Sequence, residues 1–209
     1  MLGVLLFLII LMVDLTIPYF SLASDQSFLR IKQWVFRQYP TAFSNFWIAA
    51  FYIHVFTAIF SVFAGFTQFS KWFLWKKSHR ILGKIYIATV LFFAAPSGLV
   101  MGSVANGGLT SITAFVLLSV LWWWFTFLAY KKVKQRDYEA HSKYMYLSYA
   151  LTLSALTLRA WKFGIVNYVY PMHPMDLYRL VAWIGWVPNL LVALYLIYKG
   201  KHKQMLTAE

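Results

Sequence analysis

The sequence contains no cysteine among its 209 residues. A chain without thiols forms no disulfide, no thiolate metal site, no cysteine-held iron–sulfur cluster and no thioether-attached haem. Charge is also scarce, because charged residues make up 12% of the chain and only six of them are acidic. A soluble domain normally carries about twice that share of charge. The shortage of charge therefore argues against a soluble protein.

Sequence motifs of common enzyme classes are missing as well. The chain has no nucleophile elbow, no phosphate-binding loop and no zinc-protease motif. No metal site is predicted, and whether the protein is an enzyme stays open.

Apolar residues are abundant, at 61% of the chain, and aromatic residues reach 21%. A domain of about 200 residues has too much surface to bury all of these side chains in one core. A lipid-facing surface removes the conflict, and Trp and Tyr favour the boundary between lipid and water. The composition therefore predicts a protein embedded in a lipid bilayer.

Six segments are long and apolar enough to cross a bilayer as helices. They cover residues 2–20, 46–69, 81–101, 111–130, 144–163 and 180–198. The prediction is an all-α bundle of six transmembrane helices forming a single domain, residues 1–209. The first segment has a second interpretation as a signal peptide, but no Lys or Arg precedes its apolar stretch, which favours a retained helix.

Basic residues predict the orientation. Thirteen of the nineteen Lys and Arg residues cluster at 71–84, 131–143 and 199–203, all on one predicted side. The positive-inside rule places this side, and with it both termini, in the cytoplasm of a multi-pass protein of the bacterial inner membrane. The net charge of +13 is thereby explained without nucleic-acid binding, since no basic face is interleaved with stacking aromatics.

Two predicted helices carry a polar stripe on one face. His54, Thr57 and Ser61 follow one another at helical spacing in the second segment, and Ser148, Thr152 and Arg159 do so in the fifth. Such stripes either hold helices together through hydrogen bonds or line a pocket. As a pocket, with His54 and Arg159 on the outer side, they are suited to an anion, a quinone carbonyl or a proton.

Two further histidines precede predicted helices on the cytoplasmic side. His79 lies before the third segment and His141 before the fifth, so both imidazoles are expected at one depth. Two neutral imidazoles facing one plane are able to hold a b-type haem by both axial positions. The alternative is that both are ordinary solvated histidines beside Lys and Arg. His202, in the basic tail, is expected to be solvated.

Small residues predict two local features. Gly98 and Gly102 beside Pro96 indicate close packing or a kink in the third segment. The run Asn106-Gly107-Gly108 indicates a tight turn, so that the third and fourth segments are antiparallel neighbours.

The order of several motifs resembles a known family. The first motif is His79-Arg80-Ile81-Leu82-Gly83-Lys84-Ile85-Tyr86. It is followed by residues 137–145, Leu151-Thr152 and Thr157-Leu158-Arg159, and the resemblance also includes His54 and residues 183–189. This order is similar to a bacterial family of predicted membrane proteins, domain-of-unknown-function family 2306 (DUF2306). The family implies a helical membrane fold and no particular reaction. A more distant similarity to cytochrome b561-type bundles implies haem ligation by His54, His79 or His141.

Three functions remain open on the sequence alone. The first is a membrane electron carrier with haem b at His79 and His141. The second is a small-molecule or ion transport or binding protein that uses the His54/Arg159 pocket. The third is an accessory subunit whose aromatic helices pack against a membrane-protein partner or a second copy.

Overall fold

The computed structural model describes residues 36–69, 77–169 and 172–203, together with residues 10, 13, 16, 17, 32 and 33. Every element in these residues is helical. Their order is α3 (Thr41–Gln68), α5 (Lys77–Thr89), the π-helix η2 (Val90–Ala94), α6 (Ala95–Ser103), α7 (Leu109–Lys134), α8 (Tyr138–Thr152), α9 (Ser154–Gly164), the π-helix η3 (Ile165–Val169), α10 (Pro174–Ile184) and α11 (Val187–Tyr198). The all-α prediction is confirmed for this part of the chain.

Four helical stretches of the described residues are long and apolar enough to cross a membrane. They are Thr41–Gln68, Lys77–Ser103, Leu109–Lys134 and Pro174–Tyr198, and they contain the predicted segments 46–69, 81–101, 111–130 and 180–198 almost entirely. The predicted first helix, 2–20, lies outside the described residues. The chain is thus a multi-pass membrane protein whose helices lie in a lipid bilayer, while the count of six stays a prediction.

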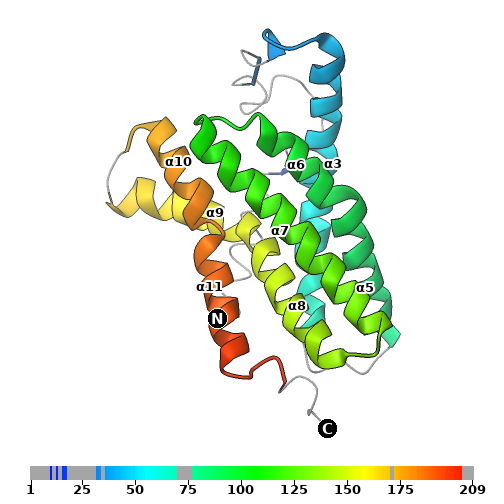
Figure 1. The fold of residues 1–209 in the computed structure, drawn as a ribbon. Coiled ribbons are helices and arrows are strands. Elements are labelled where there is room, and N and C mark those ends of the chain that lie inside the picture. The colour runs from blue at the N-terminus through cyan, green and yellow to red at the C-terminus, as the bar shows by residue number, and fades with distance from the viewer. Residues whose placement is uncertain are drawn as a thin grey trace.

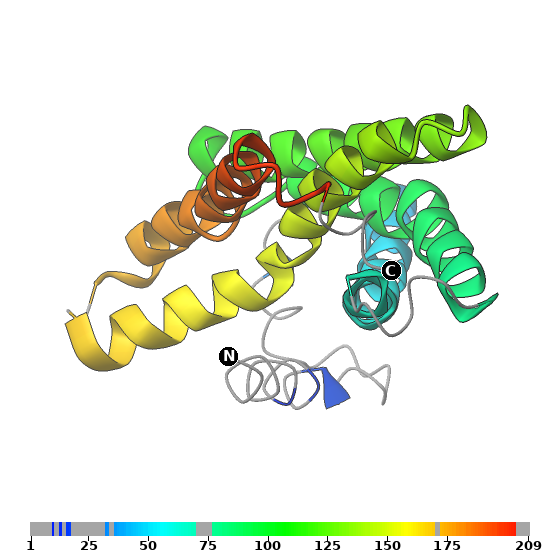
Figure 2. The same cartoon turned by 90° about the horizontal axis from the view of Figure 1, so that it is seen from below.

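The predicted fifth helix, 144–163, is helical but not one uniform apolar rod. α8 ends at Thr152, and α9 begins at Ser154 in a new direction (Figures 1 and 2). Arg159 and Lys162 lower the apolar character of α9, which explains why this stretch is absent from the four long apolar helices. The predicted sixth helix is also broken, between Ile184 and Val187.

A four-helix bundle forms the body of the molecule. α3, the α5–η2–α6 stretch, α7 and α8 run side by side, and α9 leads away from the bundle (Figures 1 and 2). α10 returns to contact α7, and α11 runs along α8. The predicted antiparallel pairing of 81–101 with 111–130 is confirmed, because α6 packs on α7 across a turn with positive φ at Gly107 and Gly108.

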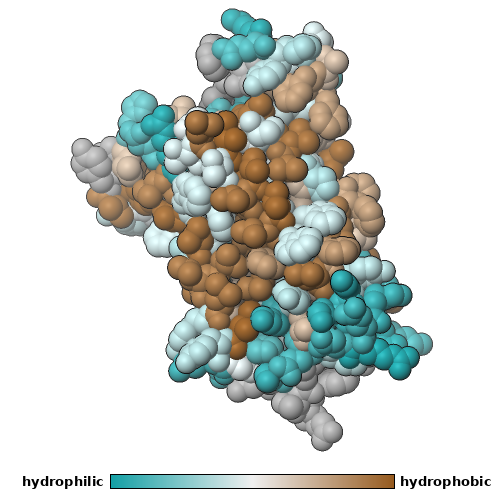
Figure 3. Space-filling model, in the orientation of Figure 1, coloured by the Kyte–Doolittle hydropathy of each residue, from teal (hydrophilic) through white to brown (hydrophobic). Residues whose placement is uncertain are grey.

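The three described basic stretches lie together. The start of α5, the α7–α8 turn and the end of α11 share the lower end of the molecule in Figure 1, here called the basic end. Above it, a broad apolar surface covers the helices up to the opposite end (Figure 3). Large exposed side chains such as Phe92, Trp124 and Leu191 belong to this surface. An apolar exterior between two polar ends is the arrangement that a bilayer requires.

A local departure from α-helical geometry follows from Pro96. Proline has no N–H to donate to a carbonyl one turn earlier, and the turn before it widens into the π-helix η2. The Trp123 indole of α7 donates to the Leu91 carbonyl at 3.1 Å. The kink predicted beside Gly98 and Pro96 is therefore present as a π-helical turn tied to the neighbouring helix.

Candidate functional site

A network of buried hydroxyl groups joins α5, α7 and α8. The Tyr86 hydroxyl lies 2.7 Å from both Ser148 Oγ and Thr152 Oγ1. Thr126 Oγ1 lies 2.7 Å from Ser148 Oγ, and the Trp122 indole donates to Thr152 Oγ1 at 2.9 Å. Each polar atom has a partner, so this network holds three helices together and leaves no group free for a ligand.

For Ser148 and Thr152, two interpretations were open on the sequence, helix–helix hydrogen bonding or a pocket, and these two hydroxyls bond side chains of neighbouring helices. The sequence did not assign Tyr86, Trp122 and Thr126 to this network, because an isolated Tyr, Trp or Thr in an apolar run carries no distinguishing pattern. On α3, Thr57 and Ser61 donate to carbonyls of their own helix, those of Ile53 at 2.6 Å and Thr57 at 2.9 Å.

The same network explains how the histidines of the basic end come together. His79 lies seven residues before Tyr86, and His141 lies seven residues before Ser148, so each histidine shares a face with its network residue. The hydroxyls of Tyr86 and Ser148 are in contact. Each histidine lies about 10 Å from its network residue along the helix axis, toward the start of the helix, so the two histidines also face each other. His141 is near enough to His79 for an electrostatic interaction between them.

Within the described part of the chain, both imidazoles have a ring nitrogen without a hydrogen-bond partner. His141 Nδ1 bonds the Ala129 carbonyl at 2.8 Å, which as a donor leaves Nε2 with its lone pair. His79 Nδ1 is buried and has no hydrogen-bond partner among the described residues. A histidine held by a backbone carbonyl through one nitrogen is the arrangement that orients metal-ligating imidazoles.

Charged groups surround this pair. The Arg80 guanidinium is close enough to act on His79. Asp137 caps α8 by accepting from the Ala140 amide at 3.1 Å and pairs with Lys132 at 3.1 Å. These two contacts, the amide first, hold the pKa of the Asp137 carboxyl below its usual value. No group of three or more His, Asp or Glu residues able to hold a metal ion occurs in the described ranges.

The C-terminal tail folds back onto α8 next to His141. Ser142 Oγ donates to the His202 carbonyl at 2.9 Å, and Lys203 pairs with Glu139 at 2.8 Å. His202 is only 5% exposed. The expectation that His202 is solvated is therefore wrong, because the tail packs along α8 and does not extend into water.

The remaining predicted site residues lie further toward the opposite end. His54 reaches from α3 to α6 and bonds the Ala94 carbonyl through Nδ1 at 2.8 Å. Arg159 on α9 donates to the Ala155 carbonyl, and its charge acts on His54. Arg159 is thus near enough to His54 for an electrostatic interaction, while a pocket formed by the two stays a prediction. Both lie apart from the His79–His141 pair.

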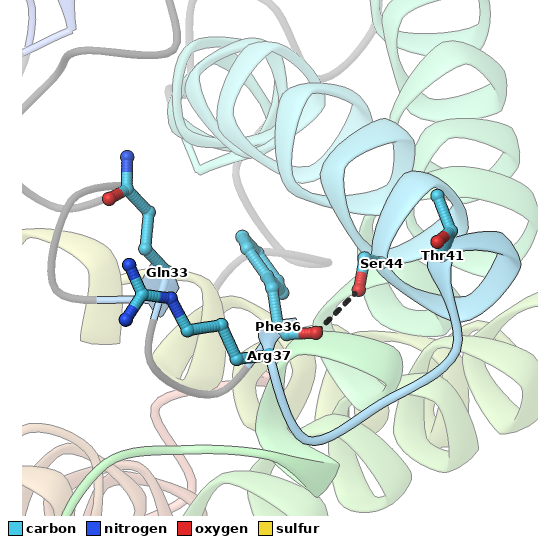
Figure 4. Close-up of a pocket in the computed structure, with 5 residues that line it drawn as sticks. All are labelled: Gln33, Phe36, Arg37, Thr41 and Ser44. Carbon is cyan, nitrogen blue, oxygen red and sulfur yellow. Dashed lines mark hydrogen bonds between the residues drawn. The ribbon is translucent and has the colours of Figure 1, made fainter.

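A shallow hollow of about 320 Å³ lies at the start of α3. Figure 4 shows Gln33 and Arg37 on one side of it and Thr41 and Ser44 on the other, with Ser44 bonded to the nearby Phe36 carbonyl. Ser44 also donates to the Pro40 carbonyl. Its polar side chains are mostly exposed and point apart, so the hollow holds no converging groups.

Comparison with known proteins gives a family. Residues 51–197 match the family described as Predicted membrane protein (DUF2306), a stretch that includes His54, His79, His141 and Arg159. No curated protein and no solved structure matches the chain.

Proposed function

The chain belongs to the DUF2306 family of predicted membrane proteins, and from this premise we propose that it is a membrane electron carrier with haem b between His79 and His141. What supports the proposal is that His79 and His141 lie within electrostatic reach of each other, each with a ring nitrogen that has no hydrogen-bond partner among the described residues. Haem b held by two histidines supplies a reversible one-electron step at iron.

The residues at the basic end have side chains of the kinds that would bind haem b. His141 is oriented through its bond to Ala129, which prepares one axial nitrogen. The buried Nδ1 of His79 lacks a partner, and a buried polar atom without one costs free energy unless something else satisfies it. Arg80 provides a positive charge beside the site that suits a propionate carboxylate.

The proposal is tested on the full chain purified after expression with ample haem. We expect a Soret band, with sharpened α and β bands after reduction. His79→Ala and His141→Ala each remove an axial ligand, so the reduced spectrum should be lost, and added imidazole should restore part of it.

His54→Ala serves as the matched control, because His54 also bonds a backbone carbonyl but lies apart from the pair. Its spectrum should match that of the wild type. Absence of Soret absorption in the wild type, or an unchanged spectrum in both paired variants, would overturn the electron-carrier proposal.

A further inference from the structure

A hollow of about 300 Å³ opens on the membrane-facing side of the bundle, between α6 and α7. It is lined by Ala95, Pro96, Leu99, Ser119, Val120 and Trp123. Leu99, Val120 and Trp123 are all more than a third exposed, so the hollow is reached from the lipid. No charged side chain lines it.

Ser119 is the unusual member of this lining. It is only 7% exposed. No hydrogen bond joins its hydroxyl to another described residue, whereas several other hydroxyls of the membrane helices donate to the carbonyl four residues earlier, namely those of Thr57, Ser61, Ser97, Thr126, Thr152 and Thr157. Ser119 lines the hollow, so its hydroxyl is a donor that a ligand there can engage.

Gly98 lets this hydroxyl approach the backbone of α6. A methyl group added at Gly98 would lie 3.2 Å from Ser119 Oγ and 3.0 Å from His54 Cε1. The Ser119 hydroxyl and the His54 ring thus both pack against Gly98.

The depth of the hollow in the bilayer determines which kind of molecule is able to bind there. Ser119 lies about 4 Å along the axis from the middle of α7, the 26-residue membrane helix. Phospholipid head groups, their ester groups and the sterol hydroxyl stay near the interface, because polar groups are costly in the hydrocarbon core. An uncharged ring with carbonyl oxygens is able to reside at this depth, accept a hydrogen bond from Ser119 and lie against the Trp123 ring.

From these observations we propose that the α6–α7 hollow binds the ring of a membrane quinone, whose carbonyl oxygen accepts a hydrogen bond from Ser119. The site lies apart from His79 and His141. It needs no haem, so the two proposals can fail separately.

The test uses a photoreactive azido-benzoquinone with a decyl tail on the full chain in nanodiscs, with labelled peptides identified by mass spectrometry. We expect label on peptides that contain residues 95–99 or 119–123. Unlabelled decylbenzoquinone should displace it, and decylbenzene, which has no carbonyl, should not.

Three variants test which residues recognise the quinone. Ser119→Ala should weaken competition by decylbenzoquinone about three- to tenfold, the range of one hydrogen bond. Leu99→Trp fills the hollow from an exposed position and should abolish labelling there. Ser61→Ala, which removes a buried hydroxyl that bonds its own helix, should change nothing.

Two results would overturn the proposal. Equal displacement by decylbenzene would show that the hollow holds a lipid tail without recognising a carbonyl. Competition by decylbenzoquinone that is unaffected by Ser119→Ala would show that the hydroxyl is not the donor, whatever the effect of Leu99→Trp.

Discussion

At the scale of single residues, Lys32 is a buried charged side chain. Lys32 is only 1% exposed, donates to the Val104 carbonyl and lies over the Trp47 ring, 5.5 Å from its centroid. Burial lowers the pKa of its ammonium from the ordinary 10.5 to about 8. Among the described residues, a carbonyl and an aromatic face stabilise this buried ammonium.

Lys32 therefore predicts a pH dependence of stability. Between about pH 8 and 10.5 the unfolded chain holds the proton that the folded chain releases, so stability should rise with pH in this window. Below about pH 8 both forms are protonated, and the cost of burying the charge is fully present. The melting temperature of the wild type should rise across the window, while that of Lys32→Met should stay flat. Parallel profiles of the two proteins would contradict this assignment.

At the scale of helices, contact between α3 and α8 depends on the absence of one side chain. A methyl group at Gly65 would lie 2.4 Å from Tyr149 Cε2 and 3.1 Å from Tyr86 Cε2. Tyr149 in turn donates to the Val62 carbonyl of α3 at 3.3 Å. Glycine thus lets the tyrosine ring lie directly on the α3 backbone, as small residues do at membrane helix contacts.

Gly65→Ala should destabilise the bundle by about 1–3 kcal/mol, because two buried rings have to shift. Gly164 provides the matched control, since a methyl group there has nothing within 4 Å. Gly164→Ala should leave stability unchanged or raise it by up to about 1 kcal/mol through better helix propensity. Unfolding in mixed micelles with increasing denaturing detergent measures both. Equal stability of the two variants would show that the α3–α8 contact is loose.

At the scale of the molecule, the basic end predicts the orientation in the membrane. The turn at Asn106 lies at the opposite end of the bundle from the end of α11 (Figure 1). With the basic end in the cytoplasm, a fluorescent protein fused after the C-terminus should fluoresce. Alkaline phosphatase inserted at Asn106 should be active outside. Active phosphatase at the C-terminus, or fluorescence from Asn106, would reverse the orientation.

The sequence was sufficient for features that depend on local composition. Apolar runs predict membrane helices because every backbone polar group must be paired within the lipid. The Gly107-Gly108 pair predicts its turn because glycine readily adopts positive φ, and the order of motifs around His79 and His141 predicts the family.

Other features were decided only by tertiary structure. His79 and His141 come together because Tyr86 and Ser148 meet two turns away, and helical periodicity alone does not say which faces of which helices pair. The burial of His202 depends on the path of the tail along α8. The close approach of the Ser119 hydroxyl to Gly98 depends on the packing of α7 against α6. Long-range packing, which a single sequence does not encode in any local pattern, determined each of these.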